Sequence, residues 1–343
     1  MHLSIFLLFI FIQSLLSSSI PTFQINLDLP PERRWKEVIL AKKQFIQNYT
    51  QMVLQKLEYP ALSLFISKIY GRSFFRNTEF AREIQGIAHY SNLSFSEIFL
   101  MNYMYESFAS CTSIVYENEN GDVVLGHNLD YYFTVPMAHS IVLVEFYKGG
   151  KMLYKAHSVA GQIGVFTGLK PDNYAITLNQ RETGDIETHL KELFINRVYP
   201  VIYNIRLGLE KASTFIDAIG FFSNVELGSP CYFTLCGTKH NQGAIITRNP
   251  TNVSNITTLQ ADDGGDGWFL VQTNSDRDLK DYEIYDIRRF VGENRMRDIG
   301  RKEVNEGNMV DEVLAKFPNN NELTILSSFV RPQTGDFNTT MWI

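Results

Sequence analysis

The chain has 343 residues, of which 45% are hydrophobic, 20% charged and 13% aromatic, and its net charge is −6. The length is enough for one large domain or two, with a sizeable buried core. This composition excludes collagen-like, disordered and disulfide-dense proteins. A mildly acidic chain without blocks of like charge also lacks the basic surface expected of a nucleic-acid-binding protein.

The first nineteen residues have the pattern of a secretory signal peptide. An almost unbroken apolar run covers residues 3–16, and three serines follow it at 17–19. An apolar run ahead of small residues is typical of a cleaved signal sequence, and we expect cleavage near Ser19. The alternative, a signal anchor, is disfavoured because a membrane span needs roughly 20 apolar residues.

Sequons for N-glycosylation agree with a secretory route. The chain has five N-x-Ser/Thr motifs, at Asn48, Asn92, Asn252, Asn255 and Asn338. Such sequons are acceptors only in proteins that enter the secretory pathway. The expected location is therefore the lysosome or the extracellular space, and these two alternatives stay open.

The predicted elements begin with helices. Apolar residues between positions 35 and 57 recur with a spacing near 3.6 residues, which predicts a helix, and a second helix is expected over 80–89. Ser94 and Glu97 have the spacing of a capping box, which predicts that a third helix begins there.

From position 111 onward the pattern favours strands. Residues 111–116 are rich in β-branched and aromatic side chains. Asn120-Gly121 predicts one hairpin and Gly149-Gly150 a second. Further strands are expected at 174–179, 232–235, 244–247, 268–273 and 323–329, and helices at 188–194, 212–222 and 309–317. This order indicates an α+β fold of stacked antiparallel sheets covered by helices.

The sequence offers no metal-binding motif. No HExxH sequence and no cysteine pair with zinc spacing is present. The loop at 262–267 lacks the closing glutamate of a calcium loop, so we interpret it as a turn. Cys231 and Cys236 would lie about 17 Å apart in an extended strand, too far for a disulfide. We therefore expect no metal, no cofactor and free cysteines in the core.

Cys111 stands at the predicted change from helix to strand. A lone cysteine is usually structural, but the surrounding motif favours a catalytic role for this one. The segments CTSIV at 111–115 and GHNLDY at 126–131 resemble the acid ceramidase and N-acylethanolamine acid amidase family. Further motifs match in the same order along the mature chain: INLDLPPERRW at 25–35, TGLKP at 167–171, TLN at 177–179, VQTNSDR at 271–277 and DIRR at 286–289. The later motifs are slightly closer to the ceramidase branch.

The resemblance implies a fold and a maturation step. Members of this family are N-terminal-nucleophile amide hydrolases with an αββα sandwich, and their precursors cut themselves before the nucleophilic cysteine. Here the cut would fall between Ser110 and Cys111, leaving a helical α-chain of residues 20–110 and a catalytic β-chain of 111–343. Because all three cysteines belong to the β-chain, we expect the two chains to associate without a covalent link.

The same resemblance implies roles for individual residues. The freed α-amine of Cys111 would take the proton of its own thiol, and the sulfur would attack an amide carbonyl. By motif match, Asn274 would donate to the resulting oxyanion and Asp130 would hold the α-amine. Arg288 would anchor this network, with its neighbour Arg289 as the alternative because the surrounding stretch is one residue longer than in the family.

Two candidate catalytic residues depart from the family pattern. His127 stands where the family has arginine, and Gln180 stands where it has glutamate. A histidine with an ordinary pKa near 6.5 is a cation in an acidic compartment. We therefore expect His127 to supply the missing positive charge in acid; the alternative is that it only fills space in a hairpin.

The expected function is that of an amidase which cleaves the N-acyl bond of ceramide to give sphingosine and a fatty acid. The alternatives are hydrolysis of N-acylethanolamines and a degenerate homologue that binds lipids without turning them over. The expected partners are a lipid amide at a membrane surface and a lipid-transfer activator, with no nucleic acid.

Overall fold

The computed structural model of the chain describes residues 20–57, 59–75, 77–103, 109–181, 198–262, 265–280 and 282–343. The expected signal peptide at 1–19 and the expected helix at 188–194 lie outside these residues. Within them, no helix combines the length and the apolar character that a bilayer span requires.

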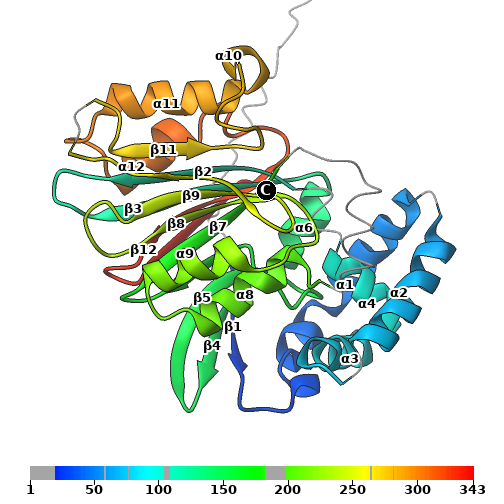
Figure 1. The fold of residues 1–343 in the computed structure, drawn as a ribbon. Coiled ribbons are helices and arrows are strands. Elements are labelled where there is room, and N and C mark those ends of the chain that lie inside the picture. The colour runs from blue at the N-terminus through cyan, green and yellow to red at the C-terminus, as the bar shows by residue number, and fades with distance from the viewer. Residues whose placement is uncertain are drawn as a thin grey trace, which may run out of the picture.

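Two β-sheets form the centre of the molecule (Figure 1). The eight-stranded sheet has the order β1 (Thr22–Asn26), β4 (Ile141–Lys148), β5 (Lys151–Val159), β6 (Thr167–Lys170), β7 (Tyr174–Gln180), β8 (Cys231–Cys236), β9 (Gly243–Arg248) and β10 (Val253–Thr258). The five-stranded sheet has the order β11 (Phe269–Gln272), β2 (Ala109–Glu117), β3 (Val123–Tyr131), β12 (Thr324–Arg331) and β13 (Asp336–Met341). Strands β2 and β3 pack face to face on β7 and β8.

Helices cover the outer face of each sheet. Helices α8 (Val201–Lys211) and α9 (Phe215–Asn224) pack on the eight-stranded sheet, whereas α11 (Ile287–Ile299) and the π-helical segment η2 (Met309–Leu314) pack on the five-stranded sheet (Figure 1). The shorter helices are α6 (Thr134–Ser140), α10 (Tyr282–Tyr285) and α12 (Glu306–Asn308). The αββα sandwich is therefore confirmed.

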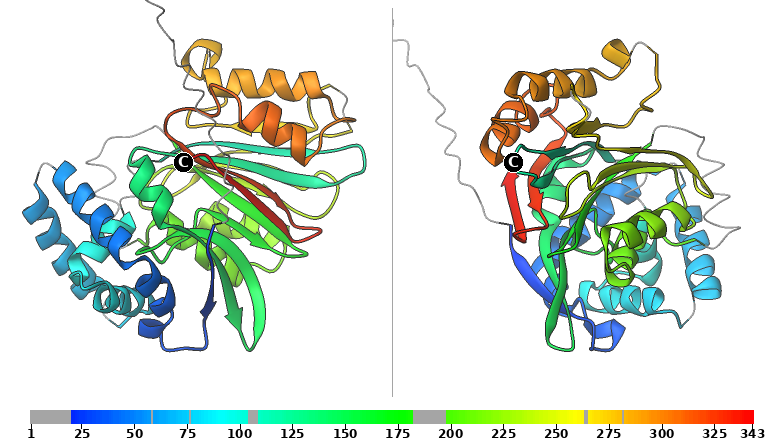
Figure 2. Two further views of the ribbon diagram at one scale, coloured as in Figure 1. Left: turned by 180° about the vertical axis from the view of Figure 1, so that it is seen from behind. Right: turned by 60° about the vertical axis from the view of Figure 1, so that its left-hand side comes forward.

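The amino-terminal helices lie to one side of the sandwich (Figures 1 and 2). They are the short η1 (Pro31–Arg33), then α1 (Lys36–Lys56), α2 (Pro60–Phe74), α3 (Glu79–Ser91) and α4 (Phe95–Tyr103). The capping box before α4 is confirmed, because Ser94 N donates to Glu97 Oε2 at 2.6 Å and Glu97 N donates to Ser94 Oγ at 3.2 Å.

One expectation about this part of the chain was wrong. The segment before Cys111 is not wholly helical, because Thr22–Asn26 forms β1 and pairs in parallel with β4. Residues before the expected cut therefore contribute a strand to the same sheet as residues after it. The expected change from helix to strand is confirmed to within two residues, because α4 ends at Tyr103 and β2 begins at Ala109, so the expected cut falls near the start of β2.

Local sequence signals explain the hairpins and the cysteines. Gly121, Gly149 and Gly150 adopt positive φ angles of 80°, 58° and 73° in the turns that join β2 to β3 and β4 to β5. Cys231 and Cys236 are buried at the two ends of β8 and form no disulfide, as expected. Among the described residues, no group of histidine, cysteine and carboxylate side chains could hold a metal ion.

A buried ion-pair cluster joins the amino-terminal helices to the sandwich. Glu83 on α3 is fully buried, and the Nη1 and Nη2 atoms of Arg206 on α8 donate to its two oxygens at 2.5 and 2.8 Å. Arg34 Nη1 and Trp35 Nε1 donate to the same carboxylate at 2.8 and 2.7 Å. Burial alone would raise the pKa of Glu83, but the charge and hydrogen bonds of Arg206, with Trp35 and Arg34, hold that pKa below its usual value.

Candidate active site

Cys111 is placed at the centre of the molecule by strand pairing. It is the third residue of β2, its side chain is fully buried, and it lies opposite Leu129 of β3. Alternate residues of a strand face the same side of a sheet. Ser113, two positions further on, donates to Asn179 Oδ1 of β7 at 2.5 Å, so Cys111 also faces the space between the sheets.

Asn274 reaches Cys111 through the register of the neighbouring strand. Gln272, the last residue of β11, lies opposite Ser113, so the antiparallel register continues to place Asn274 opposite Cys111. The Oδ1 atom of Asn274 accepts hydrogen bonds from Cys111 N at 3.1 Å, Ser110 Oγ at 2.9 Å and Arg288 Nη2 at 2.7 Å. Three donors on one oxygen fix the orientation of the amide.

Arg288 completes a cluster around the backbone of Cys111. It lies in the first turn of α11, and its Nη1 atom donates to Asp130 Oδ2 at 3.2 Å and to Cys111 O at 3.3 Å. Arg289 instead donates through Nη1 to the backbone oxygen of Asp276 at 2.9 Å. The structure therefore favours Arg288 over Arg289 as the arginine of this cluster.

Asp130 is a buried carboxylate whose partners only partly offset the cost of burying its charge. It is the penultimate residue of β3, opposite Ser110, and accepts from Thr324 Oγ1 at 2.7 Å and from Asn321 Nδ2 at 3.4 Å. Burial raises the pKa of Asp130, although the bond from Thr324 and the charge of Arg288 oppose that rise. This carboxylate therefore takes up a proton at a higher pH than an ordinary aspartate.

Gln180 belongs to the cluster through its backbone. Its carbonyl oxygen, at the end of β7, accepts from Asn274 Nδ2 at 2.8 Å. An amide nitrogen carries two protons, and this bond uses one of them. Because the contact is made by the main chain, a glutamine in place of glutamate does not alter it. A role for the Gln180 side chain stays a prediction.

His127 contradicts the expected charge switch. It is fully buried on β3, where Nδ1 lies 2.9 Å from Thr167 Oγ1 of the opposite sheet. Burial lowers its pKa to about 3. His127 is therefore neutral at the pH where an ordinary histidine becomes a cation, because a charge between the sheets would be poorly solvated. The expectation that it replaces the family's arginine charge was wrong.

Burial of His127 in its neutral form predicts that the stability of the fold depends on pH. Unfolded His127 gains a proton near pH 6.5, whereas folded His127 resists protonation down to about pH 3, so the free energy of unfolding should fall as the pH drops between these values. His127→Gln should make this fall less steep, by up to about 1.4 kcal/mol per pH unit. Urea unfolding from pH 6.5 to 4.5 measures the slope.

His240 provides the control for this measurement. It is half-exposed, and its bonds to Asp262 and Glu117 raise its pKa. A group with a raised pKa stabilises the fold at low pH and loses that contribution as the pH rises. Between pH 6.5 and 4.5 His240 is protonated in both the folded and the unfolded chain, so His240→Gln should leave the slope in this range nearly unchanged. Equal slopes for wild type and His127→Gln would contradict burial of a neutral histidine.

Several residues of the site had no assigned role in the sequence interpretation. The hydroxyls of Ser110 and Thr324 bind Asn274 and Asp130. Arg181 donates to both oxygens of Asp276, at 2.6 and 2.7 Å, and so ties the loop after β11 to the end of β7. Arg181 lies two residues after the TLN motif and Asp276 lies inside the VQTNSDR motif, which is the signal that could have identified them.

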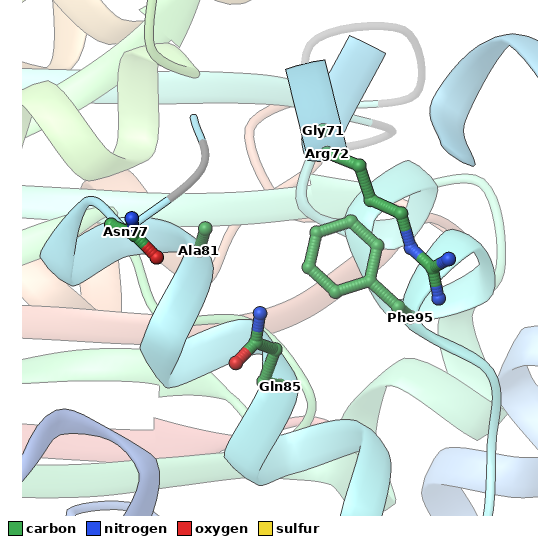
Figure 3. A pocket seen from close by; sticks show the side chains of 6 residues that line it. All are labelled: Gly71, Arg72, Asn77, Ala81, Gln85 and Phe95. Carbon is green, nitrogen blue, oxygen red and sulfur yellow. The ribbon is translucent and has the colours of Figure 1, made fainter. Parts of the chain in front are cut away.

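The described cavities lie away from the Cys111 sulfur. One, of about 480 Å³, is lined by Gly71, Arg72, Asn77, Ala81, Gln85 and Phe95 from α2, α3, the turn between them and the start of α4 (Figure 3). None of these six described residues is a nucleophile or carries a carboxylate. A second, of about 440 Å³, is lined by Arg181, Thr247, Ser254, Asn255, Asp276, Arg277 and Asp278, and it borders the loop that carries Asn274.

Similarity to known proteins extends over nearly the whole chain. The chain is 34% identical over 338 residues to a Caenorhabditis elegans protein named N-acylethanolamine-hydrolyzing acid amidase, and the match covers 94% of this chain and 93% of that protein. This chain belongs to the acid ceramidase and N-acylethanolamine acid amidase family. It is therefore an amide-bond hydrolase with the N-terminal-nucleophile fold.

Other members of the acid ceramidase and N-acylethanolamine acid amidase family give consistent results. Human acid ceramidase is 28% identical over 345 residues, covering 94% of this chain and 86% of the relative. A family model described as the beta subunit of N-acylethanolamine-hydrolyzing acid amidase matches residues 18–69. A solved structure of the Caenorhabditis elegans N-acylethanolamine-hydrolyzing acid amidase ortholog superposes with a TM-score of 0.62 at 34% identity, over 68% of this chain and 100% of that one.

Proposed function

We propose that this protein cuts itself between Ser110 and Cys111 and then uses Cys111 as the nucleophile that hydrolyses the N-acyl bond of a lipid amide. The proposal rests chiefly on one observation: Asn274 and Arg288 both bind the Cys111 backbone, and Asp130 binds Arg288. A strand that only packed in a core would not need this set of polar partners around the backbone of one residue.

In the self-cleavage step, the Cys111 sulfur attacks the carbonyl carbon of Ser110. The C–N bond breaks as the nitrogen takes a proton, and the acyl group passes to sulfur as a thioester. Water then hydrolyses the thioester, which restores the thiol and leaves Ser110 with a free carboxylate. Asn274 Oδ1, which accepts from the Cys111 nitrogen before the cut, can hold the α-amine that this nitrogen becomes.

The α-amine of Cys111 that the cut sets free makes hydrolysis of the substrate amide feasible. An α-amine has an ordinary pKa near 8 and can accept the thiol proton, so one residue supplies both nucleophile and base. The attacked carbonyl becomes an oxyanion that needs preorganised donors. The second proton of Asn274 Nδ2 is a candidate donor, since the bond to Gln180 O uses only one.

Asn274 offers a test of this arrangement. Asn274→Ala removes the acceptor of three donors and the candidate oxyanion donor, so turnover should fall by roughly 10²–10³. We expect slower self-cleavage as well, which pulse-chase electrophoresis would measure. Normal rates for both reactions, in a variant that folds normally by circular dichroism, would remove Asn274 from the mechanism.

The first substrate candidate is an N-acylethanolamine. The relative at 34% identity and the superposed structure both carry that name, whereas human acid ceramidase is 28% identical. Ceramide is the second candidate, because the motifs at 167–179 and 271–289 resemble the ceramidase branch. Exposed apolar side chains close to the site in sequence support a lipid of either kind: Tyr132 follows β3, and Ile287 directly precedes Arg288.

The deciding experiment combines processing with substrate choice. Amino-terminal sequencing of the purified protein should find a chain that begins at Cys111. That protein is then given an N-acylethanolamine and a ceramide with the same acyl chain, in the same detergent micelles and over a range of pH. Faster release of fatty acid from the N-acylethanolamine supports the first candidate, and the reverse order supports ceramide. A correctly cut protein that hydrolyses neither would indicate a degenerate lipid-binding homologue.

We further propose that the protein enters the secretory pathway and acts in the lysosome or outside the cell, at a membrane surface and with a lipid-transfer activator. The apolar run at 3–16 and the five sequons support this route. The two chains would stay associated after the cut through strand β1 and the Glu83–Arg206 pair, both of which join residues on either side of it.

A further inference from the structure

Two edge strands of the sandwich are exposed and, apart from a register irregularity in β10 between Val253 and Asn255, lack the usual protection against pairing with other chains. β10 ends the eight-stranded sheet, and β13 ends the five-stranded sheet. An edge strand presents unpaired backbone groups, and natural proteins protect such edges with charged residues, proline or a covering element. The β10 sequence VSNITT contains no charge and no proline, and the β13 sequence DFNTTM has a single charge at its first residue.

Exposure makes both strands available to a second chain. In β10, Ser254, Asn255 and Ile256 are exposed in succession, and no residue of the strand is buried. In β13, every residue is exposed or half-buried. The opposite edges differ: β11 is buried throughout, and β1 pairs in parallel with β4.

Each of these unprotected edges carries an N-glycosylation sequon at its third residue. Asn255 and Asn338 are exposed, and each is followed two positions later by threonine. Asn255 Nδ2 donates to Thr257 Oγ1 at 3.2 Å, so the amide and the hydroxyl of this sequon already lie together on the surface. Asn338 Nδ2 donates to Glu306 Oε1 at 2.6 Å.

We propose that Asn255 and Asn338 carry N-linked glycans whose role is to cover the free edges of the two sheets and prevent edge-to-edge association. An N-linked glycan is bulky and strongly hydrated. At the centre of an edge strand of six residues it would block the approach of another strand along the whole edge. This role requires entry into the secretory pathway but does not depend on hydrolytic activity.

The experiment compares glycan loss at the edges with glycan loss elsewhere. The full chain is secreted from a eukaryotic host as wild type and as Asn255→Gln/Asn338→Gln, the latter also carrying Ser254→Ala to remove the adjacent sequon of Asn252. Asn92→Gly is the matched control, because Asn92 is exposed at the end of α3 with a positive φ of 59° that glycine adopts freely. Peptide mass mapping before and after endoglycosidase treatment reports the occupancy of each sequon, and light scattering with size-exclusion chromatography reports association.

We expect wild type to lose mass at Asn255 and Asn338 on deglycosylation. The edge variant should form higher-mass species that grow with protein concentration, whereas Asn92→Gly and Ser254→Ala alone should behave as wild type. A second variant, Asn255→Lys/Asn338→Lys, also lacks both glycans but places a charge on each edge, and it should regain the wild-type size. This rescue distinguishes edge protection from a general loss of folding.

Three outcomes would overturn the proposal. Unoccupied Asn255 and Asn338 in a protein glycosylated at Asn92 would show that these positions are not modified. A protein with no glycan at any sequon would show that the chain does not follow the secretory route. Association of the Lys variant to the same extent as the Gln variant would show that the edges are not the surfaces that associate.

Discussion

Replacement of Cys111 by alanine is expected to leave the chain uncut and to abolish lipid amide hydrolysis. Under the proposed mechanism, the same sulfur attacks the Ser110 carbonyl first and the substrate carbonyl afterwards, so no other group can take over either step. The methyl group of alanine fits the buried position on β2 without adding volume, and the fold should persist. Electrophoresis under denaturing conditions and a fatty-acid release assay measure the two effects.

Cys236→Ala is the matched control for this substitution. Cys236 is a free, fully buried cysteine at the far end of β8, paired with Ala175. Burial raises the pKa of its thiol, so it is a poor nucleophile. We expect this variant to be cut and active. If the Cys111→Ala protein still appears as two chains, a separate protease makes the cut and the proposed maturation is wrong.

The second large effect, a loss of stability, is expected when Glu83 is replaced. Glu83→Ala removes the buried carboxylate that binds both Nη atoms of Arg206 and leaves Arg206 with its ion pair to Glu210; breaking a buried ion pair in this way costs about 3–5 kcal/mol. Because Glu83 and Arg206 lie on opposite sides of the expected cut, the cut variant should also lose its amino-terminal chain during size-exclusion chromatography. Urea unfolding in a Cys111→Ala background isolates the stability effect from the cut.

Glu79→Ala is the control for Glu83→Ala. Glu79 lies one turn earlier on α3, also pairs with Arg34, and is half-exposed. Surface ion pairs contribute about 0–1 kcal/mol, so this variant should remain close to wild type. Similar destabilisation by both substitutions would mean that helix α3 itself, and not the buried pair, controls the association of the two parts.

Local signals were sufficient for many of the elements. The pairs Asn120-Gly121 and Gly149-Gly150, which predicted the hairpins, lie in turns where the glycines have positive φ. The capping box at Ser94 and Glu97 begins α4 as expected. The helix α11 was not predicted, because its sequence IRRFVGENRMRDI is rich in charged residues and has no clear apolar stripe. β1 was missed because its partner β4 lies more than a hundred residues away, and a short strand has little signal of its own.

The sequence by itself determined which residues are candidates for the chemistry: an ordered set of motifs identified Cys111, Asp130, Asn274 and the arginine pair at 288–289. Only the tertiary structure decided how they meet. The β11 register places Asn274 opposite Cys111, and the first turn of α11 directs Arg288 rather than Arg289 to Asp130. Burial between the sheets decided that His127 is neutral in acid, because the pKa of a side chain depends on the solvation of its charge and not on its neighbours in sequence.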